Sequence, residues 1–260
     1  RVIPISILAS QYDHIIPQLH ELASKRRFHS RWIHEFYVLQ KDISTKKGYT
    51  EEEQQLCSYL KDKPLITLDL SEKMGHDPHY LPVERLERDG IIMKSGLTPT
   101  DIMILKGDFK KYSPEAADAM LHCFFANVKE PLEQIPDLVY EMVIKRMYQN
   151  LGRIILRQRY PKQKEFFQED YLQPILNCFY EQAKLAADQP ETSASSDAIL
   201  SLSTSLPLIG VGAPIHVFLP RVAQLLHTKA IVPKYAGVAN ALGAAASRKV
   251  AYCDLTVKAE

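Results

Sequence analysis

The sequence predicts an α/β protein, and three observations lead to this class. Short apolar runs of the kind that form buried strands stand near the start of the chain, as VIPISIL and EFYVL. The segment 113–188 has the apolar period of helices. After a stretch rich in serine and threonine, short apolar runs alternate with a helical stretch, which is typical of α/β domains.

These changes of pattern divide the chain into four parts. We expect a mixed α/β segment over 1–97, a helical subdomain over 98–188, a linker over 189–198 and an α/β subdomain over 199–260. The linker is the clearest of these boundaries, because DQPETSASSDA contains no large apolar residue.

Composition excludes some classes of protein. With 260 residues, 46% of them apolar, the chain is long enough to bury a sizeable core. Its 32 basic and 31 acidic residues nearly balance, which gives no electrostatic reason to expect nucleic acid or a membrane surface as a partner. No apolar run approaches the roughly 18 residues that span a bilayer. The cysteines are scattered without a CxxC pair, so a reducing, cytoplasmic setting fits best.

The segment at about 50–95 resembles a winged helix in its order of elements. One helix is expected to stop before Pro64, a second at Gly75 and a third at Gly90, and IIMKSG would then form a strand. The segment that would read DNA, 76–90, carries four acids against two arginines. Because DNA affinity rests on neutralising phosphates, nucleic acid is an unlikely partner.

The same segment contains a spacing that is faintly typical of metal sites. His76 and His79 flank Asp77 in HDPH, but no third ligand stands nearby in the sequence. We therefore expect loop residues and no metal site.

The stretch GLTPTD fits the start of a helix. Thr98 suits the N-cap, Pro99 the first helical position and Asp101 the third, where it can reach back to the cap. The helical region that follows carries seven lysines and arginines, with no acid between Met142 and Lys164. Those charges either face an anionic ligand or lie on a solvated helix.

The stretch GVGAPIH, 210–216, has a glycine turn between an apolar run and a helical pattern. Gly210 and Gly212 would let a ligand approach the backbone, and a helix starting at Pro214 would direct its free N–H groups to the same place. A plain tight turn explains the glycines too. His216 is either a ligand contact or a hydrogen-bonded core residue, and Pro220 requires a kinked first turn or a later helix start.

A second glycine-bearing segment, AGVANALGAAAS, follows at 236–247. Eight of its twelve residues are alanine or glycine. Gly237 and Gly243 each cost a helix interior up to about 1 kcal/mol relative to alanine, so the helix is expected to lie unusually close to another backbone, a sheet or a ligand.

Three stretches together resemble the hydantoinase/oxoprolinase family: RVIPISILASQY, SGLTPTDIMILKGDF, and PLIGVGAPIHVFLPRVAQLL with IVPKYAGVANALGAAAS. They stand in the family's order and span most of the chain. The family resembles the actin, sugar-kinase and Hsp70-type ATPases, with a ribonuclease H-like fold in which two lobes hold a nucleotide. The resemblance implies the C-terminal lobe of such a fold, with a helical insert.

The resemblance also implies roles for individual residues. The glycine turn, comprising Gly210, Gly212, Ala213 and Pro214, would border adenosine, with His216 beside it. The small-residue helix would cross between the lobes, with Gly237, Asn240 and Gly243 on it. Thr98, Thr100 and Asp101 would open the helical insert, in a substrate-related or a structural role.

One departure from the family pattern is important. The superfamily holds ATP phosphates with loops of the type Asp-x-Gly-Gly-Thr, and these 260 residues contain none. We therefore expect the C-terminal part of a longer protein, whose missing N-terminal lobe is its partner and carries the phosphate side. No catalytic residue can be assigned.

The function that the resemblance implies is ATP-driven, Mg²⁺-dependent hydrolysis of a cyclic amide such as a hydantoin or 5-oxoproline. A second hydantoinase subunit is a further candidate partner. Two other classes stay open on the sequence. One is a non-catalytic ATP-fold sensor or partner protein, and the other is a winged-helix nucleic-acid binder.

Overall fold

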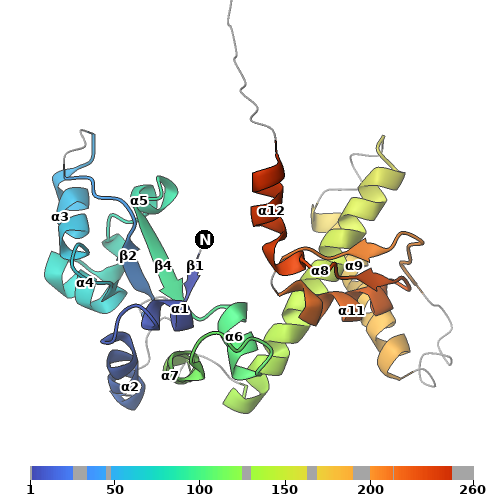
Figure 1. Ribbon diagram of the computed structural model, residues 1–260, viewed down its shortest axis with the longest axis horizontal. Helices are drawn as coiled ribbons and strands as arrows, with labels where there is room; N and C mark the ends of the chain where they lie inside the picture. Colours follow the sequence, from blue (N-terminus) through green and yellow to red (C-terminus); the bar gives the residue numbers. More distant parts are fainter. Residues whose placement is uncertain are drawn as a thin grey trace, which may run out of the picture. The chain divides into compact units, whose positions relative to one another are not determined.

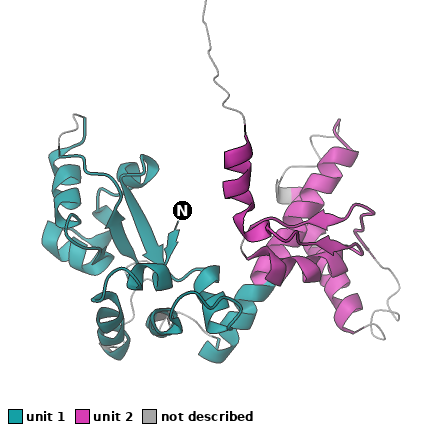
Figure 2. Ribbon diagram, in the orientation of Figure 1, with its two compact units in different colours: residues 1–141 teal, residues 142–260 magenta. Residues whose placement is uncertain are grey.

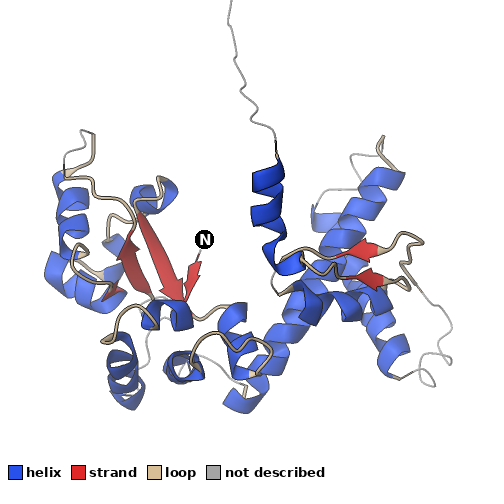
Figure 3. Cartoon of the chain, viewed as in Figure 1, coloured by secondary structure: helices blue, strands red, loops and turns tan. Residues whose placement is uncertain are grey.

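The computed structural model describes residues 2–25, 34–44, 48–124, 130–162, 169–189, 200–212 and 214–247. Helices and short strands alternate along it, so the protein is mixed α/β (Figures 1 and 3). The chain divides into two compact units, 1–141 and 142–260 (Figure 2). The division falls within one long helix of the segment predicted as a helical subdomain.

Unit 1 is built on a four-stranded mixed sheet. Its strands are β1 (Val2–Pro4), β2 (Phe36–Leu39), β3 (Leu65–Ile66) and β4 (Ile92–Gly96), in the order β1-β4-β2-β3. Strand β1 runs parallel to β4, while β2 is antiparallel to both β4 and β3. The apolar patch EFYVL supplies β2.

Both faces of this sheet are covered by helices, as the alternation in β2 shows. Phe36 and Val38 enter one apolar core, whereas Tyr37 between them enters the other. Helices on the first face are α1 (Ile5–Ala9), α2 (Ile15–Lys25) and α7 (Pro114–Phe124). Helices on the second face are α3 (Glu51–Tyr59), α4 (Thr67–Met74) and α5 (Glu84–Arg88).

The sequence predicts that two helices end at Gly75 and Gly90, and the structure confirms both ends. Gly75 and Gly90 have φ of 68° and 64°, the left-handed conformation that ends a helix with least strain at glycine. The third predicted helix is divided into the 3₁₀ turn η2 (Pro78–Tyr80) and α5, because Pro82 lies between them. Strand β4 leads into α6 (Pro99–Leu105) rather than into a second wing strand.

The first apolar run differs from expectation. VIPISIL is extended only as far as Pro4, and α1 begins at Ile5. The cause is distant in sequence: the backbone N–H groups of Ile5 and Ser6 donate to the carboxylate of Asp101, which satisfies the start of a helix.

Unit 2 is mostly helical. Helix α8 (Ile135–Arg159) follows the turn η4 (Leu132–Gln134), begins in unit 1 and continues into unit 2, where it packs with α9 (Glu169–Asp188) and α11 (Ile215–Leu225). Their shared core is centred on buried aromatic and aliphatic side chains: Tyr148, Leu172, Leu176, Tyr180, Val222, Leu225 and Leu226. Gly152 permits the close approach, since a Cβ there would meet Leu176 at 2.8 Å and Leu202 at 3.0 Å.

Two strands complete the described part of unit 2. Strands β5 (Leu208–Ile209) and β6 (Ala230–Ile231) are parallel and are joined through α11. The turn η6 (Ala236–Val238) and α12 (Ala239–Ala246) follow β6. The regular helix α11 starts five residues before Pro220, so that proline lies inside it.

No helix in the described part of the chain is both long and apolar enough to cross a membrane.

Candidate functional site

The two glycine-bearing segments meet at one edge of the β5–β6 sheet. Because the strands are parallel, the segments that follow them leave from the same edge. The backbone N–H of Gly212, after β5, donates to the carbonyl of Ala236, after β6, at 2.7 Å. The carboxyl edge of parallel strands is where open α/β sheets bind ligands, so this edge is the candidate site.

Gly210 is explained by packing alone. It is buried, and a Cβ there would lie 2.6 Å from Leu219 Cδ2 and 2.7 Å from Ile215 Cγ1. These distances are shorter than van der Waals contact allows. Residue 210 must therefore be a glycine for the first turns of α11 to pack against it. No ligand is required to account for Gly210.

Gly212 has a different environment. Its φ is 114°, which side-chain-bearing residues rarely adopt, and no atom lies within 4 Å of the position of a Cβ. Helix α11 begins three residues later, after Pro214 as N-cap. Some of the first N–H groups of this helix are hydrogen-bonded within the chain. The N–H of Ile215 donates to the carbonyl of Gly212, and the N–H of Val217 donates to the carbonyl of Pro214. The open space beside Gly212 is therefore the more distinctive feature.

The small-residue helix is exposed from Asn240 onwards, while Ala239 at its start is half-buried. No residue of α12 is buried, and a Cβ at Gly237 or Gly243 would meet nothing within 4 Å. Asn240 and His216 are also exposed. The structure places these residues on open surface; Ala213, predicted with them, lies outside the described residues.

Two residues at this edge were missed by the sequence reasoning. Lys234 and Tyr235 stand between β6 and η6, both exposed, with the Lys234 ammonium 5.5 Å from the centre of the Tyr235 ring. A base can stack on an aromatic ring, and an ammonium attracts phosphate. The sequence contained a signal for these two residues, because Pro-Lys-Tyr directly follows an apolar strand in the stretch that leads to the second glycine segment.

The segment of the chain that forms the edge has no acidic residues, and many of its exposed side chains are apolar. Between Asp197 and Asp254 the sequence contains no Asp or Glu. Large apolar side chains are exposed around the two strands and α12: Leu206, Ile209, Val211, Ile231, Val232, Tyr235, Val238 and Leu242. The segment offers no carboxylate ligand for Mg²⁺, which prefers oxygen donors.

Thr98 and Asp101 form a structural clamp. Asp101 is fully buried, and its carboxylate accepts hydrogen bonds from the backbone N–H and the hydroxyl of both Thr98 and Ser6, and from the N–H of Ile5. These five donors use the whole acceptor capacity of the carboxylate. Thr100 is half-buried in the same first turn of α6.

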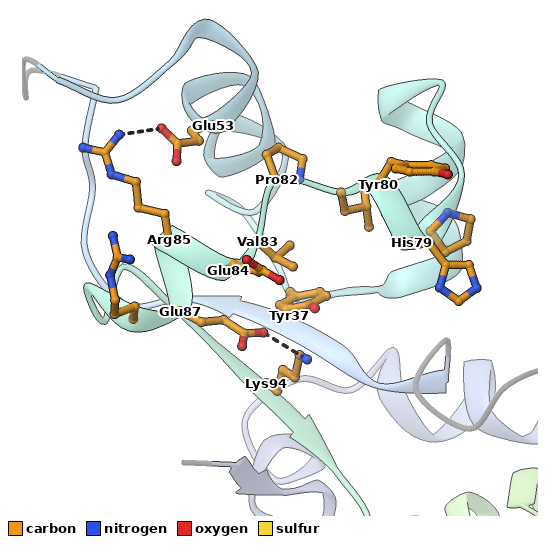
Figure 4. A pocket seen from close by; sticks show the side chains of 13 residues that line it. Tyr37, Glu53, His79, Tyr80, Pro82, Val83, Glu84, Arg85, Glu87 and Lys94 are labelled. Carbon is orange, nitrogen blue, oxygen red and sulfur yellow. Dashed lines mark hydrogen bonds and ion pairs between the residues drawn. The ribbon is translucent and has the colours of Figure 1, made fainter.

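A separate pocket of about 570 Å³ lies in unit 1, between the sheet and the segment η2–α5 (Figure 4). Its floor includes Tyr37 on β2 and, directly opposite in register, Lys94 on β4. Lys94 forms an ion pair of 3.2 Å with Glu87. Burial, and then the nearby carboxylates of Glu87 and Glu35, raise the pKa of Tyr37 well above its usual range, so its hydroxyl stays protonated.

The wall of the pocket is held by a second ion pair. Arg85 lies 3.4 Å from the buried carboxylate of Glu53, which also accepts the N–H of Thr50 as part of a capping box. The guanidinium of Arg85 stacks over the ring of Tyr49 at 4.7 Å. The pocket is therefore shaped by side chains that neighbours fix in place.

Other sequence candidates have ordinary partners. His76 pairs with Glu52 at 3.7 Å, and no group of three or more potential ligands among the described side chains could hold a metal ion. In the basic stretch of α8, Lys145 pairs with Glu181 at 2.7 Å and Arg153 donates to Gln173. Tertiary packing thus compensates part of a charge run that the sequence shows as uncompensated.

Comparisons of the chain with protein-family profiles, with curated proteins and with solved structures find no match.

Proposed function

We propose that this chain forms the adenosine side of an ATP-dependent hydrolase that opens cyclic amides such as hydantoins or 5-oxoproline. The resemblance of three ordered stretches to the hydantoinase/oxoprolinase family suggests the activity. The observation that carries the proposal is the hydrogen bond from Gly212 to Ala236, since it joins both glycine segments at one open edge of a parallel sheet.

The chemistry explains why ATP is needed. A cyclic amide is a weak electrophile. Transfer of a phosphoryl group from ATP to its carbonyl oxygen makes the ring carbon easier for water to attack. Mg²⁺ would neutralise the phosphates during that transfer. The acid-free segment 198–253 cannot hold the metal, so in this proposal it shapes the nucleoside site with Gly212, Lys234 and Tyr235.

The exposed apolar face of β5 and β6 supports the proposal that a further lobe completes unit 2. Parallel sheets occur almost only with both faces covered, and a two-stranded sheet is marginally stable by itself. Ile209 and Ile231 are neighbours in register on this sheet, yet they are 65% and 46% exposed. In the proposal, the phosphate-binding lobe of the same cytoplasmic protein covers them; a second hydantoinase subunit is the other candidate.

Ligand binding tests the nucleoside half of the proposal. Saturation-transfer NMR with the chain should show contacts from the purine protons of adenosine and ATP but none from the protons of ribose 5-phosphate, which lacks the base. Gly243→Leu should leave the thermal midpoint unchanged, since nothing lies near that position, and should weaken the adenosine signal if the helix borders the nucleoside. Leu138→Ala, on the far part of α8 in unit 1, serves as a control. Absence of any adenosine contact at millimolar concentration contradicts the proposal.

Turnover tests the catalytic half. A polypeptide that also carries Asp-x-Gly-Gly-Thr loops should release phosphate from ATP when hydantoins or 5-oxoproline are added, and the present chain alone should not. Adenosine binding without turnover in the longer protein would favour the sensor instead. Equal phosphate release from both would refute the division of the site.

A further inference from the structure

The charges that line the pocket of unit 1 are paired with one another. Arg85 lies 3.4 Å from Glu53, and Lys94 lies 3.2 Å from Glu87 (Figure 4). Paired charges present little net field to an ion, so a charged ligand would lose its hydration without gaining an opposite charge in return. The pocket therefore fits an uncharged occupant.

The paired groups still have hydrogen-bonding capacity. Within the described part of the chain, the ion pairs of Arg85 use Nε and Nη1, so the N–H groups of Nη2 remain for a ligand. Glu87 Oε1 is buried, and although Lys94 lies 3.2 Å away, this oxygen accepts no hydrogen bond of good geometry from the described residues. The exposed carboxylate of Glu84 adds a further acceptor. Donors and acceptors left over side by side suit hydroxyl groups, which both donate and accept.

The other side of the pocket presents an aromatic ring. Figure 4 shows His79 and Tyr80 on the side of the hollow opposite Arg85. Tyr80 is 80% exposed, and its backbone is rigid: Asp77 accepts the N–H of His79, and a proline stands two residues to either side of Tyr80. A ring held in this way needs little ordering on binding. Its face carries partial negative charge and attracts C–H groups.

A sugar ring has both of the surfaces that this pocket requires. Its hydroxyls lie around the edge of the ring, and its C–H groups form an apolar face. The volume of about 570 Å³ lies in the range of small-molecule sites. A wholly apolar ligand fits less well, because it would leave the buried Oε1 of Glu87 without a donor.

We infer that the pocket of unit 1 binds a neutral sugar, with the hydroxyls of the sugar on Arg85 and Glu87 and its C–H face on Tyr80. This inference does not depend on the function proposed for unit 2.

An NMR titration of the full chain measures this binding. Glucose, galactose, mannose and maltose are the probes, and at least one should shift the amide signals of residues 79–94 and saturate in the millimolar range. Glucuronate and glucosamine add a negative and a positive charge, and both should bind more weakly than the neutral sugar. No shift with any neutral sugar, tighter binding of a charged analogue, or shifts confined to unit 2 would each overturn the inference.

Variants test the two sides of the pocket separately. Tyr80→Ala should weaken binding about fivefold, the size of effect expected from one aromatic contact, whereas Tyr80→Phe keeps the ring and should bind like the parent. Arg85→Lys keeps a cation near Glu53 but removes the Nη2 donor, and should also weaken binding.

The matched control is Tyr171→Ala, at an exposed tyrosine of α9, which should change nothing. Thermal midpoints of all four variants show whether each is folded. Because Tyr80 is so exposed, Tyr80→Ala should keep the parent midpoint. Unchanged affinity in that variant would exclude this pocket as the sugar site.

Discussion

The hydroxyl of Ser6 donates a 2.6 Å hydrogen bond to the carboxylate of Asp101, 95 residues away. The sheet explains why they meet: β1 and β4 are parallel neighbours, with Pro4 opposite Gly96, and each strand leads into a helix at the same edge. Asp101 lies in the first turn of α6 and also accepts the first N–H groups of α1. One buried carboxylate therefore stabilises the start of two helices.

Replacement of this carboxylate should destabilise unit 1. Asp101→Asn puts an amide NH₂ among five donors, and we expect the free energy of unfolding to fall by roughly 2–4 kcal/mol. Urea denaturation followed by circular dichroism measures the change. Asp137→Asn, at an exposed acid that pairs with Lys106, should cost under about 1 kcal/mol. Unchanged stability in Asp101→Asn would contradict the stabilising role assigned to this carboxylate.

The two glycine segments should respond oppositely to a methyl group. Gly210→Ala forces a Cβ into Leu219 and Ile215, and should lower the stability of unit 2 by about 1–3 kcal/mol. Gly237→Ala meets nothing, and should leave stability unchanged or raise it by up to about 1 kcal/mol. Thermal midpoints of the two variants provide the comparison. Equal losses would show that the packing beneath α11 is not what requires Gly210.

The hydroxyl of Tyr148 is buried and has no hydrogen-bond partner among the residues that the structure describes. Because removing an unsatisfied group costs little, Tyr148→Phe should leave the chain equally stable or up to about 1 kcal/mol more stable at pH 7. Burial also raises the pKa of Tyr148 from 10 to about 12. Below pH 10 the hydroxyl is protonated in both the folded and the unfolded chain, so its titration does not affect the free energy of unfolding. Between pH 10 and 12 the unfolded chain loses this proton more readily than the folded chain does, so the free energy of unfolding falls as the pH rises.

Stability measured against pH checks this sign. Between pH 10 and 12 the parent chain should lose more stability than Tyr148→Phe does. Tyr171→Phe, at an exposed position, should follow the parent curve. Parallel curves for the parent and Tyr148→Phe would contradict the assigned protonation.

The cysteines should differ sharply in reactivity. Burial raises the pKa of the Cys57 and Cys123 thiols to about 11, whereas Cys178 is exposed. Because thiolate is the reactive form, among the three cysteines that the structure describes iodoacetamide at pH 8 should modify Cys178 before the other two, which should stay intact until denaturant is added. Peptide mass spectrometry identifies the modified positions, and rapid native labelling of Cys57 or Cys123 would show that the helices on their side of the sheet open readily.

Local chemistry made much of the fold predictable. The stops at Gly75 and Gly90 and the start at Thr98 each depend on a few neighbouring residues, and all three occur where the sequence placed them. The start of α1 was not predictable in this way. VIPISIL has the composition of a strand, and only an acid 95 residues away converts its second half into a helix.

Part of the candidate site was also predictable, because it too depends on residues that are close together in the sequence. The glycines of both segments could be found from their spacing, and the structure brings the segments together. Sequence could not separate Gly210, which side chains of α11 require, from Gly212, which faces open space. The pocket of unit 1 was missed because its walls come from five elements, β2, α3, η2, α5 and β4, whose proximity depends on strand order.

Because α12 has no buried residue, this helix can report on assembly. Its amide protons should exchange with deuterium quickly in the chain as described, since no side chain of the helix is anchored in a core. Any lobe that settles on the surface of β5 and β6 would slow that exchange, so the docking event can be timed without labelling either component.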